Sequence, residues 1–73
     1  MFNKRLREMR MKRKLTQQMT ADSADIALRT LQNYEQGIRE PSYDILVKLA
    51  DTLDVSLYYL FGRTDDPESH RRK

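Results

Sequence analysis

Residues 15–37 have the sequence LTQQMTADSADIALRTLQNYEQG, which predicts two short helices joined by a tight turn. Thr16 is a suitable N-cap for the first helix, because its hydroxyl can accept hydrogen bonds from N–H groups of the first turn. Ala21 and Ala24 are small enough to let a second helix cross closely. Asp25 supplies the turn, since aspartate is among the few non-glycine residues that reach the left-handed region at a tolerable cost.

The second helix is predicted to run from Ile26 to Gly37, and glycine commonly ends helices. At about 100° per residue, Leu31 and Tyr34 point to one side of this helix. Another side carries mostly polar residues over an arc of about 140°, namely Leu28, Arg29, Gln32, Asn33 and Gln36. Arginine and amide side chains on one helical face suit the base edges of DNA. The stretch therefore predicts a DNA-reading helix-turn-helix.

The chain of 73 residues has room for one small domain with a thin core. It contains no cysteine, which excludes disulfides and thiolate zinc sites, and the lone His70 cannot build a metal site. No run approaches the roughly 18 apolar residues that a membrane span needs, and no signal peptide is evident. We expect a cytoplasmic protein without a metal or cofactor.

The formal net charge is +3, but the positive charge is uneven. Half of the 14 basic residues lie in the first fourteen positions: Lys4, Arg5, Arg7, Arg10, Lys12, Arg13 and Lys14. Such a cluster can be a solvated helical face, although beside a helix-turn-helix we interpret it as attraction for phosphates. Residues 66–73 are polar throughout, so we expect a domain over residues 1–65 and a disordered tail over 66–73.

Three further helices are predicted outside the central stretch. Residues 3–14 form the first, with Phe2, Leu6 and Met9 on an inward stripe and Met11 off it. Ser42 is a good N-cap for a fourth helix that ends at residues 54–55, and Ser56 is one for a fifth over residues 57–61. Without any strand-like alternation, the fold class is expected to be all-α with five helices.

From about Asn3 to Asp65 the chain resembles the Cro/C1-type, or XRE, helix-turn-helix family of phage and bacterial repressors. The residues that carry the resemblance are Leu6, Arg7, Arg10, Leu15, Thr16, Gln17, Ala21, Leu31, Tyr34, Glu35, Gly37, Pro41, Leu46, Leu49, Ala50, Leu53, Val55, Ser56, Leu60 and the GRTDD segment at 62–66. The resemblance implies a lambda-repressor-like fold, a double-stranded DNA operator as partner, and a homodimer at least on DNA.

Carried over by position, the resemblance implies that Ala27, Leu28, Arg29 and Asn33 face the major groove. Arg29 and Asn33 are four residues apart, so they share a helical face and can make bidentate bonds to guanine and adenine. Outside this motif they would be ordinary surface residues. Gln32 is a further candidate for base contact, although its side chain could reach phosphate or only solvent.

The resemblance also implies that Gln17 and Arg39 contact phosphates, and we add Gln18 and Gln36 as candidates for the same role. Gln17 also has a structural role in the turn. Two residues of the second helix depart from the family. Ala27 replaces the usual Ser or Thr N-cap, which forfeits roughly 1 kcal/mol of capping. Leu28 stands where a polar residue is common, so it could contact a thymine methyl or mark a protein-binding surface.

Arg10 and Glu35 match residues that form an ion pair behind the recognition helix in relatives. Their alternative roles are one more cation of the basic helix and a terminal helical acid. Tyr58, Tyr59 and Phe61 exceed what a five-residue helix needs for one core. They are core or rim residues, or they lie in a dimer contact.

Catalysis is not expected, because the chain has no Ser/His/Asp set, no paired carboxylates in an apolar run and no glycine-rich phosphate loop. The sequence thus predicts a small sequence-specific DNA-binding regulator, acting as a repressor, with no small-molecule ligand. The alternative is a protein-interaction module, such as an antitoxin or an adaptor that binds a polypeptide through the face that carries Leu28.

Overall fold

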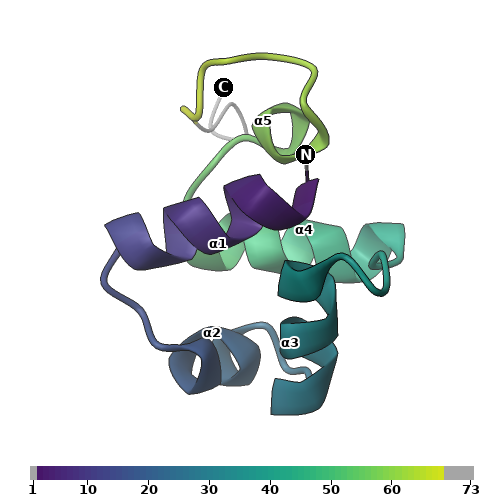
Figure 1. Ribbon diagram of the computed structural model, residues 1–73. Coiled ribbons are helices and arrows are strands. Elements are labelled where there is room, and N and C mark those ends of the chain that lie inside the picture. The colour runs from purple at the N-terminus through teal and green to yellow at the C-terminus, as the bar shows by residue number, and fades with distance from the viewer. Residues whose placement is uncertain (1, 69–73) are drawn as a thin grey trace.

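The computed structural model describes residues 2–68, and this part of the chain contains five α-helices and no strand (Figure 1). The helices are α1 (Phe2–Lys12), α2 (Gln17–Ser23), α3 (Leu28–Gln36), α4 (Tyr43–Leu53) and α5 (Leu57–Phe61). The predicted all-α class with five helices is confirmed.

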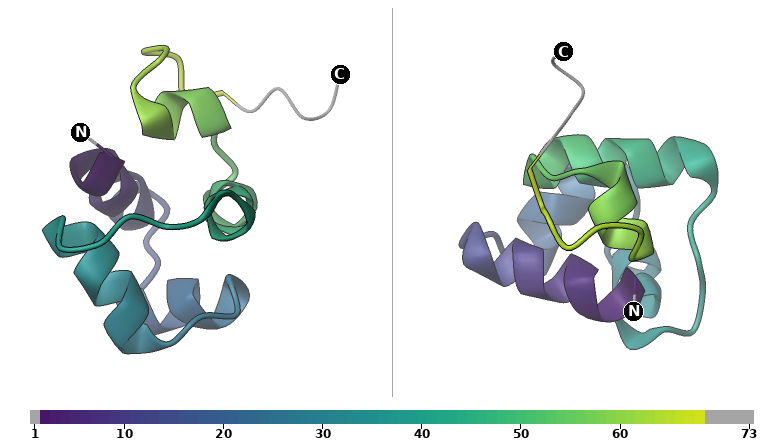
Figure 2. Two further views of the ribbon diagram at one scale, coloured as in Figure 1. Left: turned by 90° about the vertical axis from the view of Figure 1, so that its right-hand side faces the viewer. Right: turned by 90° about the horizontal axis from the view of Figure 1, so that it is seen from above.

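Helices α1 and α4 lie between α5 at one end of the molecule and the α2–α3 pair at the other (Figure 1). Helix α1 contacts α3 and α5, whereas α4 contacts α2 and α5. The left view of Figure 2 shows the same order, with α5 above and α2 and α3 below. One end of the domain is thus formed by the helix-turn-helix alone.

The core is built from apolar side chains that all five helices contribute. Its buried members are Leu6, Met9, Ala21, Ala24, Leu31, Tyr34, Leu46, Leu49, Ala50, Leu53, Val55 and Leu60. Phe2 packs against this cluster from its edge, while Met11 is 58% exposed. The predicted inward stripe of the first helix is confirmed.

The predicted caps of the last two helices are present. Ser42 Oγ accepts a hydrogen bond from Ile45 N at 3.4 Å, and Ser56 Oγ accepts from Tyr58 N at 3.1 Å and from Tyr59 N at 3.3 Å. Helix α4 ends where Asp54 takes a left-handed conformation with φ of 54°. Asp54 and Ser56 thus fix the corner between α4 and α5.

Two helix boundaries differ from the prediction. Helix α1 ends at Lys12 rather than at Lys14, because Lys14 adopts a left-handed φ of 61° and donates its N–H to Met11 O at 2.9 Å. Helix α3 begins at Leu28 rather than at Ile26, which is instead part of the turn and packs against the core. The connections on both sides of α2 are therefore longer than the sequence suggested.

Residues 64–68 are tied back to the body of the domain. Arg5 Nη1 donates to Tyr59 O at 2.6 Å and to Thr64 O at 2.8 Å, and its Nη2 lies 3.0 Å from Asp65 Oδ1. Ser56 N donates to Pro67 O at 2.8 Å. Of the polar tail expected from residue 66, Pro67 is thus bonded to the body of the domain. Residues 69–73, with His70, lie outside the described part.

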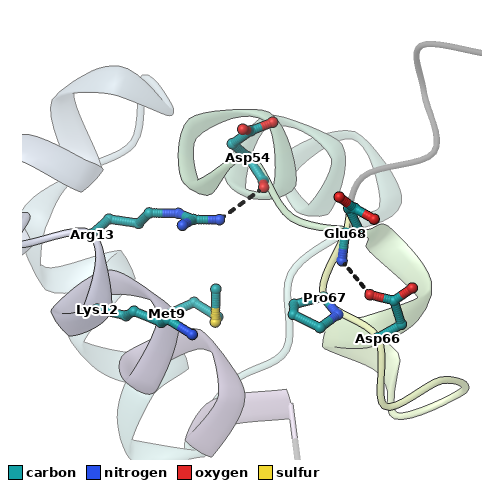
Figure 3. A pocket seen from close by; sticks show the side chains of 7 residues that line it. All are labelled: Met9, Lys12, Arg13, Asp54, Asp66, Pro67 and Glu68. Carbon is teal, nitrogen blue, oxygen red and sulfur yellow. Dashed lines mark hydrogen bonds between the residues drawn. The ribbon is translucent and has the colours of Figure 1, made fainter.

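Arg13, which directly follows α1, caps the C-terminal end of α4. The dashed line in Figure 3 marks its hydrogen bond to Asp54. Its Nε donates to Leu53 O at 2.7 Å and its Nη2 to Asp54 O at 3.1 Å. Because Arg13 donates to carbonyl oxygens at the end of the helix, Arg13→Met is expected to lower the free energy of unfolding by about 1 kcal/mol. Urea denaturation measures this. The exposed Arg7 provides the control Arg7→Met, and equal losses would contradict a capping role.

Candidate nucleic-acid interface

The turn between α2 and α3 forms as the sequence predicts. Thr16 Oγ1 accepts a hydrogen bond from Met19 N at 3.0 Å and caps α2. Asp25 has a φ of 58°, in the left-handed region, and Ile26 N donates to Ala21 O at 2.9 Å. Ala21 and Ala24 are fully buried, which lets the two helices approach closely. Local sequence is therefore sufficient to set the angle between α2 and α3.

Helix α3 has a buried side and an outward side. Leu31, Tyr34 and Glu35 are buried, and Gly37 ends the helix with a φ of 79°. On the outward side Arg29 and Gln36 are exposed, while Gln32 and Asn33 are half-buried. The polar side chains predicted to share a face therefore do so. Helix α3 itself lies at the end of the molecule formed by the helix-turn-helix (Figure 1).

The start of α3 lacks a side-chain cap, as expected. Ala27 takes the extended N-cap conformation but makes no capping hydrogen bond, and it is exposed. Leu28, the first residue of the helix, is half-buried. Part of its apolar side chain is thus available at the outer surface of the helix-turn-helix.

An ion pair joins α1 to the back of α3. Arg10 Nε donates to Glu35 Oε2 at 2.5 Å, and Arg10 Nη2 donates to Glu35 Oε1 at 3.2 Å. The two side chains are 13% and 4% exposed, so the pair is largely shielded from water. Arg10 Nη1 also donates to Leu15 O at 2.9 Å. Arg10 thus holds α3 and the segment before α2 against α1.

Gln17, at the start of α2, also bonds to this pair. Its Nε2 donates to Glu35 Oε1 at 3.1 Å, and its Oε1 accepts from Gln32 Nε2 at 3.3 Å. These bonds fit the structural role that was open for Gln17 beside phosphate contact, although the bond to Gln32 was not predicted. The two amides are fifteen residues apart, and no local pattern signals such a contact.

The remaining candidates for phosphate contact are all exposed: Gln18, Gln36 and Arg39. Gln18 Nε2 donates to Asp22 Oδ1 at 2.9 Å within α2, which holds its amide on the outer side of that helix. Gln36 and Arg39 flank Gly37, where the chain leaves α3. Gln36 therefore lies at the C-terminal end of the outward face of α3, whereas Gln18 and Arg39 lie outside α3.

The basic cluster over residues 4–14 divides into cations that bond within the domain and cations that do not in the described contacts, so its attraction for phosphates remains a prediction that rests on the second group. Arg5, Arg10 and Arg13 each donate to carbonyl or carboxylate oxygens of the domain itself. The four other cations of the cluster are exposed: Lys4, Arg7, Lys12 and Lys14. Arg5 and Arg13 donate to carbonyls 40 or more residues away, and Arg10 pairs with Glu35, 25 residues away. Sequence position alone therefore could not distinguish the two groups.

The three aromatic residues of α5 have different surroundings. Tyr58 and Phe61 are 58% and 53% exposed. Tyr59 is half-buried and packs against the core, with the Arg5 guanidinium 4.2 Å from the centre of its ring. Phe61 lines a shallow pocket with Phe2. Of these three aromatic residues of α5, Tyr58 and Phe61 therefore present large apolar surfaces. Helix α5 lies at the end of the domain opposite the helix-turn-helix (Figure 1).

The described residues hold no group of three or more metal-ligating side chains. Within residues 2–68, no helix has the length and apolar character needed to cross a membrane. A cleft between the end of α1 and residues 66–68 is lined by cations on one wall and acids on the other (Figure 3). It lies outside the α2–α3 unit.

Two crossing helices with an outward polar face define a helix-turn-helix domain, and comparison with known proteins gives the same class. Residues 6–60 match the model of the helix-turn-helix family, so the chain belongs to this family. The resemblance to Cro/C1-type regulators is thereby confirmed.

One curated relative is the HTH-type transcriptional regulator YobD of Bacillus subtilis, itself uncharacterized. It is 41% identical over 68 residues, which cover 93% of this chain and 61% of YobD. The chain therefore spans less than two thirds of that relative's length.

Two solved structures share the fold. The phage P22 c2 repressor in complex with a synthetic operator has a TM-score of 0.83 and 23% identity, covering 88% of this chain and 97% of that one. The regulator SinR in complex with DNA has a TM-score of 0.80 and 27% identity, covering 84% and 98%. The lambda-repressor-like architecture is therefore confirmed.

Proposed function

We propose that this protein is a sequence-specific DNA-binding transcriptional regulator that acts as a repressor. The observation that carries the proposal is the outward face of α3, which carries Arg29 and Asn33. Helix α3 lies at one end of the domain (Figure 1). A helix of this kind fits the major groove of double-stranded DNA. Bound to an operator, the protein would exclude other proteins from the same site.

Within this proposal, the bases are contacted by Ala27, Leu28, Arg29, Gln32 and Asn33, and the phosphates by Gln17, Gln18, Gln36 and Arg39. The similarity to SinR, whose structure contains DNA, supports the assignment of the partner. We further propose a homodimer on DNA, with Tyr58 and Phe61 as contact residues, since their large apolar surfaces are exposed. Operator binding would place the protein in the cytoplasm.

Arg29→Ala is expected to weaken binding to the preferred site by roughly 1 to 3 kcal/mol and to relax preference at one base pair, because a bidentate contact to guanine is lost. The preferred site is obtained by selection from random duplexes. Affinities for this site and its single-base variants are then measured at fixed salt, since phosphate contacts make every affinity salt-dependent.

Arg39→Ala is the matched control, because Arg39, like Arg29, is an exposed arginine but lies outside α3. It is expected to weaken binding to all sequences by a similar factor, since a phosphate contact carries no base information. Identical selectivity profiles for the two variants would contradict these roles. Failure of the unmodified protein to shift any duplex in an electrophoretic assay would favour a protein-interaction module instead.

A further inference from the structure

Arg5 binds the last helix, and the segment that follows it, to α1. Its Nη1 donates to Tyr59 O at 2.6 Å and to Thr64 O at 2.8 Å, and its guanidinium lies 4.2 Å from the centre of the Tyr59 ring. The Arg5 side chain is only 16% exposed, which strengthens these bonds relative to bonds in water. The ion pair with Asp65 adds little, because the Asp65 side chain is fully exposed. Arg5 therefore holds α5 chiefly through backbone carbonyls and an aromatic ring.

Helix α1 carries a second shielded arginine, which binds α3 instead. Arg10 donates to Glu35 of α3 through two nitrogens. Helix α1 contacts both α3 and α5, and these two helices lie at opposite ends of the domain (Figure 1). Because the five residues from Arg5 to Arg10 rise by only about 7.5 Å along the helix, both attachments are made to one short, rigid element. The orientation of α5 relative to α3 is thus set through α1.

This orientation matters for a dimer that uses α5 as its contact. The distance between the two α3 helices of such a dimer depends on how each copy holds α3 relative to its own α5. The shortest principal extent of the domain is 20 Å. With a lever of about 20 Å, a rotation of α5 by about 10° displaces α3 by about 3.5 Å, which is close to one base-pair step. A small rotation at α5 therefore changes the register on DNA by a whole base pair.

We propose that Arg5 is a positioning residue that fixes the spacing of half-sites that the dimer accepts. The proposal rests on the proposed function, and in particular on α5 as the dimer contact. Tyr59, which Arg5 binds, lies between the proposed contact residues Tyr58 and Phe61 in the sequence of α5. A guanidinium suits this role, because it presents five N–H donors in a planar fork and stacks on aromatic rings, whereas an ammonium group is a point charge.

The test uses duplexes in which two selected half-sites have the preferred spacing, or one base pair more or fewer. The unmodified protein is expected to prefer one spacing by about tenfold, because a wrong spacing prevents both copies from binding together. Arg5→Met should reduce this preference to about twofold, since α5 is then held less firmly against α1. Affinity for an isolated half-site should not change. Arg5→Lys should retain part of the preference, because one donor to a carbonyl remains.

Arg13→Met is the matched control. Arg13 also donates to two backbone carbonyls, but these lie at the end of α4, at Leu53 and Asp54. Its loss lowers stability without removing the attachment of α5 to α1, so the preference for spacing should stay near that of the unmodified protein. Asp65→Asn removes only the exposed ion pair and should likewise leave the preference unchanged.

Residual dipolar couplings of backbone N–H groups in the DNA-free protein give an independent measurement. Arg5→Met should change the orientation of α5 relative to α3, whereas Arg13→Met should not, and the same spectra verify that each variant is folded. An unchanged preference for spacing, or an unchanged orientation of α5, would overturn the positioning role. If Arg5→Met does not fold, Arg5→Lys decides by the same two measurements. A single bound copy of the unmodified protein, with no preferred spacing, would contradict the proposed dimer itself and the inference with it.

Discussion

Replacing Arg10 with methionine is expected to destabilise the domain by about 3 kcal/mol or more, and to lower its melting temperature by roughly 10 °C or more. The reason is the fate of Glu35, whose side chain is only 4% exposed. Without Arg10 the carboxylate keeps only the Gln17 amide as a described side-chain partner. A buried charge without a counter-ion costs far more than an intact pair contributes.

Lys12→Met is the control for Arg10→Met, because Lys12 is an exposed cation of the same helix. It should change the melting temperature by only a few degrees. The double change of Arg10→Met with Glu35→Leu should recover part of the loss, since no charge then remains unpaired. Equal melting temperatures for the two single variants would show that the pair does not hold the domain together.

Moving one half-site of the operator by about five base pairs is expected to reduce affinity on the order of 100-fold, because the second copy then faces the opposite side of the duplex. One domain of this size covers only about 600 to 1,000 Å² of its own surface on DNA, which suits modest affinity. Two copies with half-sites roughly 34 Å apart would double the readout.

Sedimentation of the complex gives its stoichiometry, and titrations on the shifted and unshifted duplexes give the two affinities. Tyr58→Ser with Phe61→Ser should reproduce the loss on the unshifted operator, since both residues are exposed and outside the helix-turn-helix. It should leave affinity for an isolated half-site unchanged. A complex with one protein copy, whose affinity ignores the shift, would rule out the proposed dimer.

The elements that could be predicted from sequence are those set by neighbouring residues. Thr16, Ser42 and Ser56 cap the following helices within three residues of themselves. Asp25 and Asp54 take left-handed conformations that short acidic side chains tolerate. The spacing of apolar residues predicts the buried and outward sides of α3, because the helical repeat relates residues only three or four positions apart. The pairing of Arg10 with Glu35 was predicted from the family resemblance rather than from neighbouring residues.

The features that could not be predicted depend on partners far along the chain. Lys14 adopts a left-handed backbone conformation, although lysine has no special preference for it. The residues around Lys14 contain no sequence signal for the end of a helix. Arg5 and Arg13 donate to carbonyls at least 40 residues away in the sequence. The distribution of charge along the chain does not indicate these partners and predicts only solvent-exposed cations. The Gln17–Gln32 contact likewise exists only once α2 and α3 have crossed.

The bonds of Arg5 have a consequence for how the protein is made. Its three acceptors lie 54, 59 and 60 residues downstream, so during translation these bonds form only after residue 65 has left the ribosome. The α2–α3 unit depends on nearby residues and can form while the rest of the chain is still being synthesised. The contacts of α1 with the C-terminal segment are therefore among the last to form, after the α2–α3 unit has been synthesised.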